Sequence, residues 1–230
     1  MLNWLSRDGK ILLAARPLQS FSASFVSIFI AVYLNLLGLP LWQIGLVLTG
    51  GLLSSTFFNT VVGFMADRVG RRRLLVIFGS LTALSGLIFA TTLNLFLLIP
   101  VAVVTSLGYR GGFGPVQMLE RVILAQSCSD ERRTRMYAIR STINSVAVTG
   151  GSLSTGAVIL FQGWFGLSLG ASYRWMFGLY AILNALTAVL YSMLSEEAEV
   201  EGLREEAPPL TPETRRNVMK LSLLFSVDSL

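Results

Sequence analysis

Four long stretches without a charged residue dominate this sequence. They cover residues 17–66, 74–109, 141–173 and 175–195. A helix needs roughly 20 mostly apolar residues to cross a bilayer core of about 30 Å, so the first three stretches hold two crossings or nearly so, and the last holds one. Inside hydrocarbon only helices and closed barrels satisfy every backbone polar group, and these runs lack the alternation of barrel strands. The sequence therefore predicts an all-α, polytopic transmembrane bundle.

Turn residues divide these stretches into six predicted spans. Gly38 and Pro40 separate the first two spans, and Asn94 ends the third. The predicted spans cover about residues 18–38, 42–66, 74–93, 95–118, 139–161 and 174–194, with ends good to a few residues.

The chain is thus expected to have four parts. These are a cytoplasmic N-terminal segment at 1–16, a six-helix membrane unit at 17–195, a cytoplasmic linker at 196–217 and an apolar segment at 218–230. The linker is acidic and contains proline, and it lacks apolar periodicity. The apolar segment is interpreted as the start of a seventh span, so the chain is expected to be a piece of a longer protein.

The positive charges predict the orientation. With six spans both ends lie on one side, and 16 of the 18 Lys and Arg residues fall on that side. Of the other two, Arg174 lies in an opposite loop and Arg110 lies inside a span. Basic residues gather on the cytoplasmic face, which predicts a multi-pass plasma-membrane protein with its N-terminus in the cytoplasm. The same rule explains the net charge of +5 without a nucleic-acid partner.

Composition argues against catalysis. The chain has no histidine, which excludes histidine catalysis, histidine metal ligation and a histidine pH switch. No metal-ligand cluster, phosphate loop or nucleophile–base pair is visible, so no metal or cofactor is expected. A membrane-embedded enzyme stays as a remote alternative, since it would need convergent Asp, His, Ser or Cys residues in the spans.

A short motif lies between the second and third predicted spans, on the predicted cytoplasmic side. It reads Gly63-Phe64-Met65-Ala66-Asp67-Arg68-Val69-Gly70-Arg71-Arg72-Arg73. It resembles the loop signature G-x-x-x-D-R-x-G-R-R/K of the major facilitator superfamily in residue type, spacing and place. The alternative is an ordinary basic loop, which the aspartate and the glycines disfavour.

Each residue type in this motif has a physical reason. Gly63 allows a close helix approach, and Gly70 allows a tight turn with positive φ. Asp67 ends a helix and can pair with a neighbouring arginine or face the start of a helix in a partner half. The basic residues can bind helix-end carbonyls, nearby acids or anionic lipid. The predicted gating-loop residues are Gly63, Asp67, Arg68, Gly70, Arg71 and Arg72.

A second motif, residues 110–114, reads RGGFG and resembles the family's span-four pattern R-x-x-Q-G, with Phe113 in place of glutamine. A charge at the bilayer centre costs about 2.5–3.5 kcal/mol, so Arg110 should face a cavity or a partner. Helical spacing puts Gly114 and Gln117 on the same face. Arg110 is therefore a candidate contact for an anion or for a coupling acid; the alternative is a structural arginine bonded to backbone carbonyls.

Acidic residues are scarce in the predicted spans. Glu120 lies near the predicted cytoplasmic boundary and is expected to pair with Arg121 or a loop arginine. Asp228 would lie roughly 12 Å into a seventh span at 1.5 Å per residue. In an intact parent chain it is a candidate cavity acid, and in this chain it is more simply an exposed acid in a tail.

Other polar residues in the spans are weaker candidates. The resemblance implies that the first span faces a central cavity, and close helix packing explains its serines equally well. The glycine-rich residues 149–156 do not match the proline-containing motif of drug–proton antiporters in this family, and they are interpreted as packing residues. The further candidate cavity residues are Ser24, Ser27, Asn35 and Asn144.

The resemblance covers the whole chain and implies the superfamily's N-terminal six-helix domain, with 3+3 inverted repeats and a site near the midplane. The implied function is transport of a small, anionic or drug-like solute by alternating access. The implied partners are membrane lipid, the substrate and a C-terminal six-helix half of the same parent chain. The alternative is a non-transporting or self-dimerising half-size membrane protein.

Overall fold

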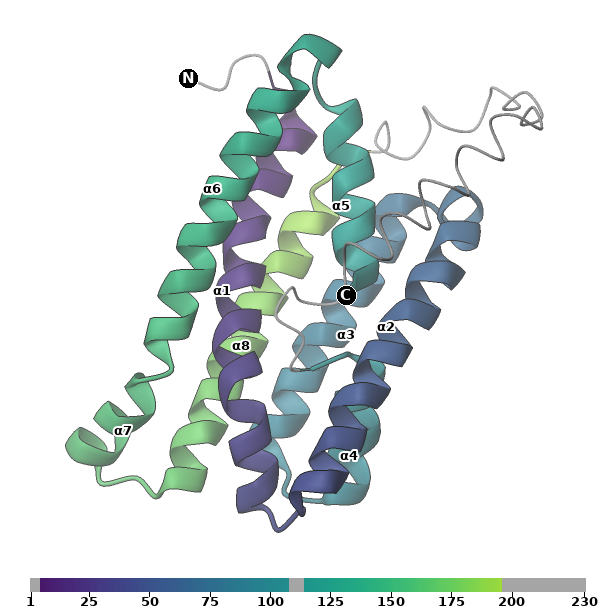
Figure 1. Cartoon of the computed structure of the whole chain (residues 1–230). Helices are drawn as coiled ribbons and strands as arrows, with labels where there is room; N and C mark the ends of the chain where they lie inside the picture. The colour runs from purple at the N-terminus through teal and green to yellow at the C-terminus, as the bar shows by residue number, and fades with distance from the viewer. Residues whose placement is uncertain (1–4, 108–113, 196–230) are drawn as a thin grey trace. The chain divides into compact units, whose positions relative to one another are not determined.

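The computed structural model describes residues 5–107 and 114–195, apart from the side chains of Asp67 and Asp130. Every regular element in this part of the chain is helical (Figure 1). The helices are α1 (Arg7–Leu36), α2 (Leu41–Val69), α3 (Arg71–Thr91), α4 (Leu95–Val104), α5 (Gly114–Gln126), α6 (Asp130–Ser154), α7 (Ala157–Phe165) and α8 (Leu169–Ser192). Five helical segments of the described chain are long and apolar enough to cross a membrane, and α4 is a shorter apolar helix. The prediction of an all-α membrane bundle is confirmed.

Turn chemistry ends the helices close to where the sequence predicts. Gly38 and Gly70 follow α1 and α2 with φ values of 96° and 98°. A residue with a side chain would be strained in this conformation, whereas glycine adopts it freely. Gly166 ends α7 in the left-handed region. Asn94 and Ser168 begin α4 and α8 by accepting a hydrogen bond from the backbone N–H of Phe96 and Ala171, respectively.

Two predicted spans are interrupted. The fifth becomes α6 and α7, because the chain bends at Thr155 and Gly156 after a serine-rich turn in which Ser154 Oγ donates to the carbonyl of Gly151. The fourth becomes α4 and α5, since Ser106 takes a positive φ of 51° after α4. Its hydroxyl donates to the carbonyl of Gly51 at 2.7 Å, which anchors the break to α2.

The first helix begins at Arg7, well before the predicted start near residue 18. Ser6 caps it by accepting a hydrogen bond from the N–H of Gly9 at 3.1 Å. Arg16 is therefore part of a continuous helix and is buried, with 3% of its surface exposed. Residues 7–16 of the predicted N-terminal segment therefore extend the bundle.

The helix ends fall into two groups (Figure 1). At one end, which we call the basic end, α1 begins, α8 ends, and the α2–α3 and α5–α6 turns lie. The α1–α2, α3–α4 and α7–α8 turns lie at the other end, which we call the far end. An aromatic core fills the far half of the bundle between α1, α3 and α8: its buried rings include Phe25, Phe29, Tyr33, Phe89 and Phe177.

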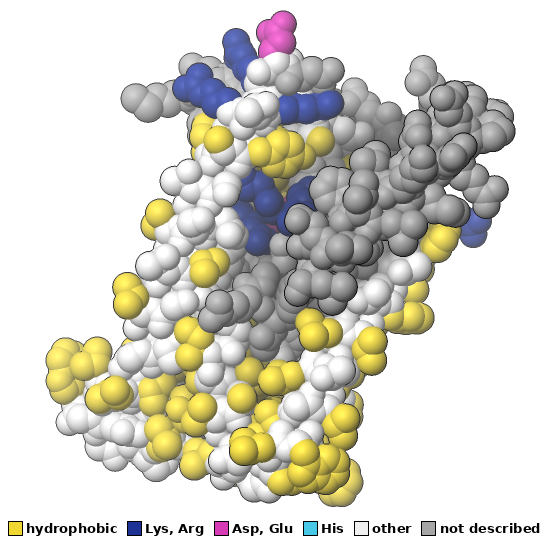
Figure 2. Space-filling view, viewed as in Figure 1, with side chains coloured by type: hydrophobic (Ala, Val, Ile, Leu, Met, Phe, Trp, Pro, Cys, Tyr) yellow, Lys and Arg dark blue, Asp and Glu magenta, His cyan; other side chains and the backbone are white. Residues whose placement is uncertain are grey.

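Helix α1 is the central helix, because 61% of its most apolar stretch is buried in the bundle. The buried share of the corresponding stretch is only 22% in α2 and 17% in the α6–α7 segment. Large apolar side chains are therefore exposed along these outer helices, among them Leu53 and Phe57 on α2 and Ile159 on α7. Figure 2 shows many such side chains on the face that it views. An apolar surface of this extent is what lipid or another membrane segment covers.

Glycines bring the helices close together. A Cβ atom at Gly86 of α3 would lie 2.9 Å from the backbone nitrogen of Ala181 in α8. A Cβ at Gly151 of α6 would lie 3.0 Å from the carbonyl carbon of Phe21 in α1, and nearer still to its oxygen. The interpretation of the glycines at 149–156 as packing residues fits the contact at Gly151.

We predict that Gly86→Ala lowers the free energy of unfolding by about 1–3 kcal/mol, because the added methyl group overpacks the α3–α8 contact. Thermal unfolding of the purified protein in detergent, followed by tryptophan fluorescence, measures the change. Gly178→Ala on α8 is the matched control, since a Cβ there meets no atom within 4 Å. Equal melting temperatures for the two variants would contradict the close approach.

Candidate functional site

The glycine- and arginine-rich loop turns from α2 to α3 at the basic end. Gly70 forms the turn itself, and the backbone of Asp67 lies in the last turn of α2, while its side chain is outside the described part. Gly63 is exposed, and a Cβ there would lie 3.8 Å from Met118 Cε, an ordinary contact. Within the described residues, the close helix approach expected at Gly63 is therefore not seen.

Two arginines of this loop reach the ends of other helices. A third, Arg68, is exposed. Arg71 Nη1 donates to Gln126 Oε1 at 2.7 Å, at the end of α5. Arg72 Nη2 donates to the carbonyl of Ser192 at 2.7 Å, where α8 ends. A cation at a helix C-terminus complements the helix dipole, so the loop ties α3 to α5 and α8.

A buried carboxylate lies deeper in the bundle. Glu120 of α5 is completely buried. Its Oε2 accepts hydrogen bonds from Arg140 Nη2 of α6 at 3.1 Å and from Arg16 Nη1 of α1 at 3.4 Å. Its Oε1 accepts a hydrogen bond from Tyr191 Oη of α8 at 2.6 Å. One carboxylate therefore connects four helices.

The expected pairing of Glu120 with an arginine of the cytoplasmic side is met by Arg140, whereas Arg121 is not its partner and Arg16 is an additional one. Arg16 precedes the first predicted span and Arg140 lies at the start of the fifth, yet helix α1 begins at Arg7 and α6 begins at Asp130. Both arginines are therefore carried about 13–15 Å along their helices from the basic end at 1.5 Å per residue. A carboxylate without such partners could not be buried there at an acceptable cost.

Arg16 carries the polar contacts further. Its Nε donates to Asn144 Oδ1 at 3.0 Å, and Nη1 also donates to Gln19 Oε1 at 3.0 Å. Its Nη2 reaches Gln117 Oε1 at 3.5 Å. Ser20 donates a second hydrogen bond to Asn144 Oδ1, at 2.8 Å. We call Arg16, Gln19, Gln117, Glu120, Arg140, Asn144 and Tyr191 the polar cluster.

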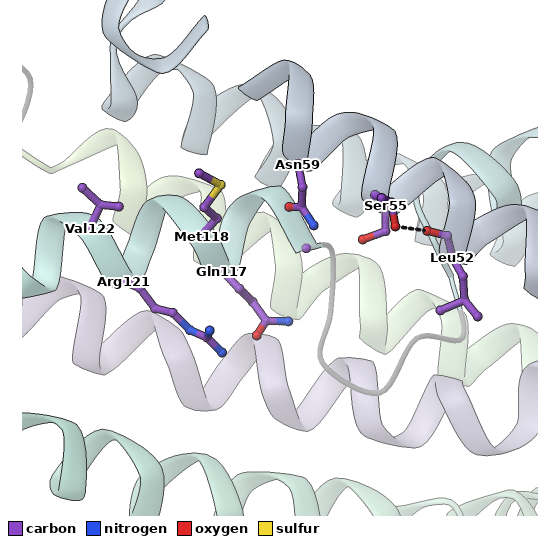
Figure 3. Close-up of a pocket in the computed structure, with 9 residues that line it drawn as sticks. Leu52, Ser55, Asn59, Gln117, Met118, Arg121 and Val122 are labelled. Atoms are coloured by element: carbon purple, nitrogen blue, oxygen red, sulfur yellow. Dashed lines mark hydrogen bonds between the residues drawn. The ribbon is translucent and has the colours of Figure 1, made fainter. Parts of the chain in front are cut away.

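A hollow of about 570 Å³ opens beside the polar cluster, between α2 and α5 (Figure 3). In the close-up, Gln117 and Arg121 both extend from α5 toward the neighbouring helix α1, while Asn59 and Ser55 reach from α2. Gln117 belongs to both the hollow and the polar cluster. The lining residues of this α2–α5 hollow are Leu52, Ser55, Thr56, Asn59, Gly114, Gln117, Met118, Arg121 and Val122.

The other predicted cavity residues have different surroundings. Ser24 is buried and donates to the carbonyl of Val148 in α6 at 2.9 Å, and Ser27 donates to the carbonyl of Ser24. Asn35 donates to the carbonyl of Leu39 at the far end. The structure thus brings Gly114, Gln117 and Asn144 to the hollow or the polar cluster, and leaves these three residues elsewhere.

Arg110 and Asp228 lie outside the described residues. In the described ranges, no three His, Cys, Asp or Glu residues come together in a way that could hold a metal ion.

Residues 12–227 match the family model described as the Major Facilitator Superfamily. The chain belongs to this superfamily. Its resemblance to the superfamily, carried by the loop signature, is therefore confirmed, as is the bundle type of the fold.

Two curated relatives extend the comparison. An uncharacterized membrane protein of Saccharomyces cerevisiae, YJR124C, is 26% identical over 98% of this chain and 58% of its own length. The glucose transporter GlcP of Staphylococcus epidermidis is 26% identical over 75% of this chain and 36% of its own length. The chain thus spans little more than half of the first relative and about a third of the second.

For this member of the superfamily, sequence reasoning missed Arg16, Gln19, Arg140 and Tyr191 of the polar cluster. Two of them had a signal: Arg16 directly precedes one uncharged stretch and Arg140 directly precedes another. A charge at the edge of a span can be carried inside when its helix extends into water. No sequence signal marks Tyr191 among the other aromatic residues.

We predict that Glu120→Gln destabilises the bundle by about 3–5 kcal/mol, because it leaves two buried guanidinium groups without a counter-charge. The amide can still accept the hydrogen bond from Tyr191, so the loss reports charge rather than shape. Glu131→Gln on the exposed start of α6 is the control. Thermal unfolding in detergent measures both variants; equal stability would show that the carboxylate is not the charged partner.

Proposed function

We propose that this chain is the N-terminal half of a major facilitator transporter that moves a small solute by alternating access. The α2–α5 hollow, joined to the polar cluster through Gln117, is the observation that carries the proposal. A polar recess beside buried charges, in a bundle with an apolar outer surface, is what a membrane carrier needs to hold a solute.

The outer surface supports a two-half arrangement. Leu53 and Phe57 are exposed on α2, and Ile159 is exposed on α7. In a complete transporter, part of this surface contacts lipid and part contacts the C-terminal six-helix half. The relatives, each longer than this chain, are in line with a second half.

The basic end faces the cytoplasm in this proposal, and the protein lies in the plasma membrane. Arginines gather at that end, as the positive-inside rule requires, including Arg71, Arg72 and Arg132. The loop from Gly63 to Arg73 then acts at the inner gate. Asp67 would contact the partner half when the cytoplasmic side is closed, while Arg72 holds the end of α8.

The whole transporter, reconstituted in proteoliposomes, tests the proposal. We expect uptake of a labelled small solute, with glucose as the first probe because one relative is named a glucose transporter. Asp67→Asn and Arg110→Ala should each lower the initial rate about tenfold, equivalent to about 1.4 kcal/mol of barrier.

Arg135→Gln is the control, since Arg135 is exposed on α6 and belongs to neither proposed site. Unchanged uptake in the Asp67 and Arg110 variants would remove these residues from the mechanism. No uptake across a panel of sugars, organic acids and drug-like cations, together with self-association of the chain in crosslinking, would favour the self-dimerising alternative.

A further inference from the structure

We propose that the polar cluster and Arg121 recognise an anionic group, a carboxylate or a phosphate, on the solute that enters the α2–α5 hollow. The inference rests on the proposed transport function and names the substrate class of the same site. It is carried by the unequal charges around Glu120, by the burial of the arginines, and by the position of Arg121 at the hollow.

The charges around Glu120 do not balance. Arg16 and Arg140 are 97% and 92% buried, and both donate to the same oxygen of Glu120. The other oxygen accepts a hydrogen bond from the neutral hydroxyl of Tyr191. Among the described residues, one carboxylate therefore faces two buried guanidinium groups, which leaves a net charge of about +1 in a region of low dielectric.

Further positive charge lies next to this pair. Arg16 is repelled electrostatically by both Arg140 and Arg121. Arg121 is exposed and lines the hollow, and its guanidinium makes no hydrogen bond or ion pair with a described residue. In addition, Arg140 Nε is buried and has no hydrogen-bond partner in the described chain. An entering anion would offset this excess of positive charge and of unpaired donors.

The hollow gives the anion a path to these groups. Its volume of about 570 Å³ is within the usual range of small-molecule sites, about 300–1,000 Å³, so it has room for a solute larger than an inorganic ion. Gln117 lines the hollow and contacts Arg16, and it extends to the same side of α5 as Arg121 (Figure 3). Figure 2 shows basic side chains within a recess of the viewed face. Hydroxyl and amide groups of Thr56 and Asn59 can hold the neutral part of the solute.

The polar cluster also suits an anion by its geometry. A guanidinium group offers two parallel N–H donors to a carboxylate or phosphate, and such charge-assisted pairs are among the strongest hydrogen bonds in proteins. Within the described residues, the N–H donors of the Arg121 guanidinium are available at the hollow. Arg16 and Arg140 are buried and would attract the anion through their charge. Arg121 is therefore the direct contact, and Glu120 sets how much positive charge remains.

A matched set of probes tests the proposal on the whole transporter in neutral phosphatidylcholine nanodiscs. Gluconate, glucose 6-phosphate and glucose have similar size and differ in charge, and tryptophan fluorescence or thermal stabilisation reports binding. We expect either anion to bind at least tenfold more tightly than glucose. Arg121→Gln should remove this preference, Arg121→Lys should keep part of it, and Arg135→Gln should not change it.

A second experiment measures the charge of the hollow without a bound ligand. In a Cys128→Ser background, Thr56→Cys places a thiol in the hollow. We expect a negatively charged methanethiosulfonate to react with it faster than a positively charged one, after both rates are divided by those with a free thiol. Arg121→Gln should lower this ratio at least threefold. If none of the three soluble probes binds, this ratio of reaction rates decides whether the hollow carries an excess of positive charge.

Three results would overturn the proposal. Equal binding of glucose and the anions, with transport intact, would keep the transporter and reject the anion site. A thiol reaction ratio near one, or one unchanged by Arg121→Gln, would reject the excess of positive charge. Stabilisation by phosphatidylglycerol vesicles, with none by the soluble anions, would assign the arginines to a lipid headgroup. Anion binding without uptake of any solute would instead reject the transport function and keep the anion site.

Discussion

Much of the described bundle depends on the contacts of the buried Glu120 carboxylate. Its two oxygens bind groups from α1, α6 and α8, and it stands on α5. Helices in lipid gain little from apolar burial, because lipid tails are as apolar as leucine, so close packing and polar contacts hold them together. The far half of the bundle uses packed aromatic rings and glycine contacts, and the basic half uses this ion pair network.

Much of the fold could be predicted from the sequence, because uncharged runs and turn residues decide where helices cross and where they end. Gly38 and Gly70 lie at turns as expected, and Gly166 ends a further helix. The early start of α1 could not be predicted from hydropathy, since charged residues precede the apolar run and the cap at Ser6 is a weak local signal. The break between α6 and α7 depends on local serine hydrogen bonds that many continuous helices also contain.

The candidate site was predictable only in part. Gln117 and Asn144 were placed among the cavity candidates, and they contact Arg16 in the structure. The arginine partners of Glu120 could not be found from spacing alone, because they come from residues 104 positions earlier and 20 positions later in the chain. Pairing over such distances is a property of the packed bundle. The gating role of Asp67 remains a prediction, since its side chain lies outside the described part.

The complete burial of Glu120 also decides how the bundle responds to ionic strength. Mobile ions screen exposed charges over about 8 Å at physiological salt and about 3 Å at 1 M, but they reach buried pairs poorly. The contact of Arg71 with Gln126 is exposed, so water and salt compete with it directly. The pairs of Glu120 with Arg16 and Arg140 are shielded by the helices themselves. Concentrated salt will therefore weaken the exposed contacts at the basic end, such as that of Arg71, at lower concentration than the buried pairs of Glu120 that connect four helices.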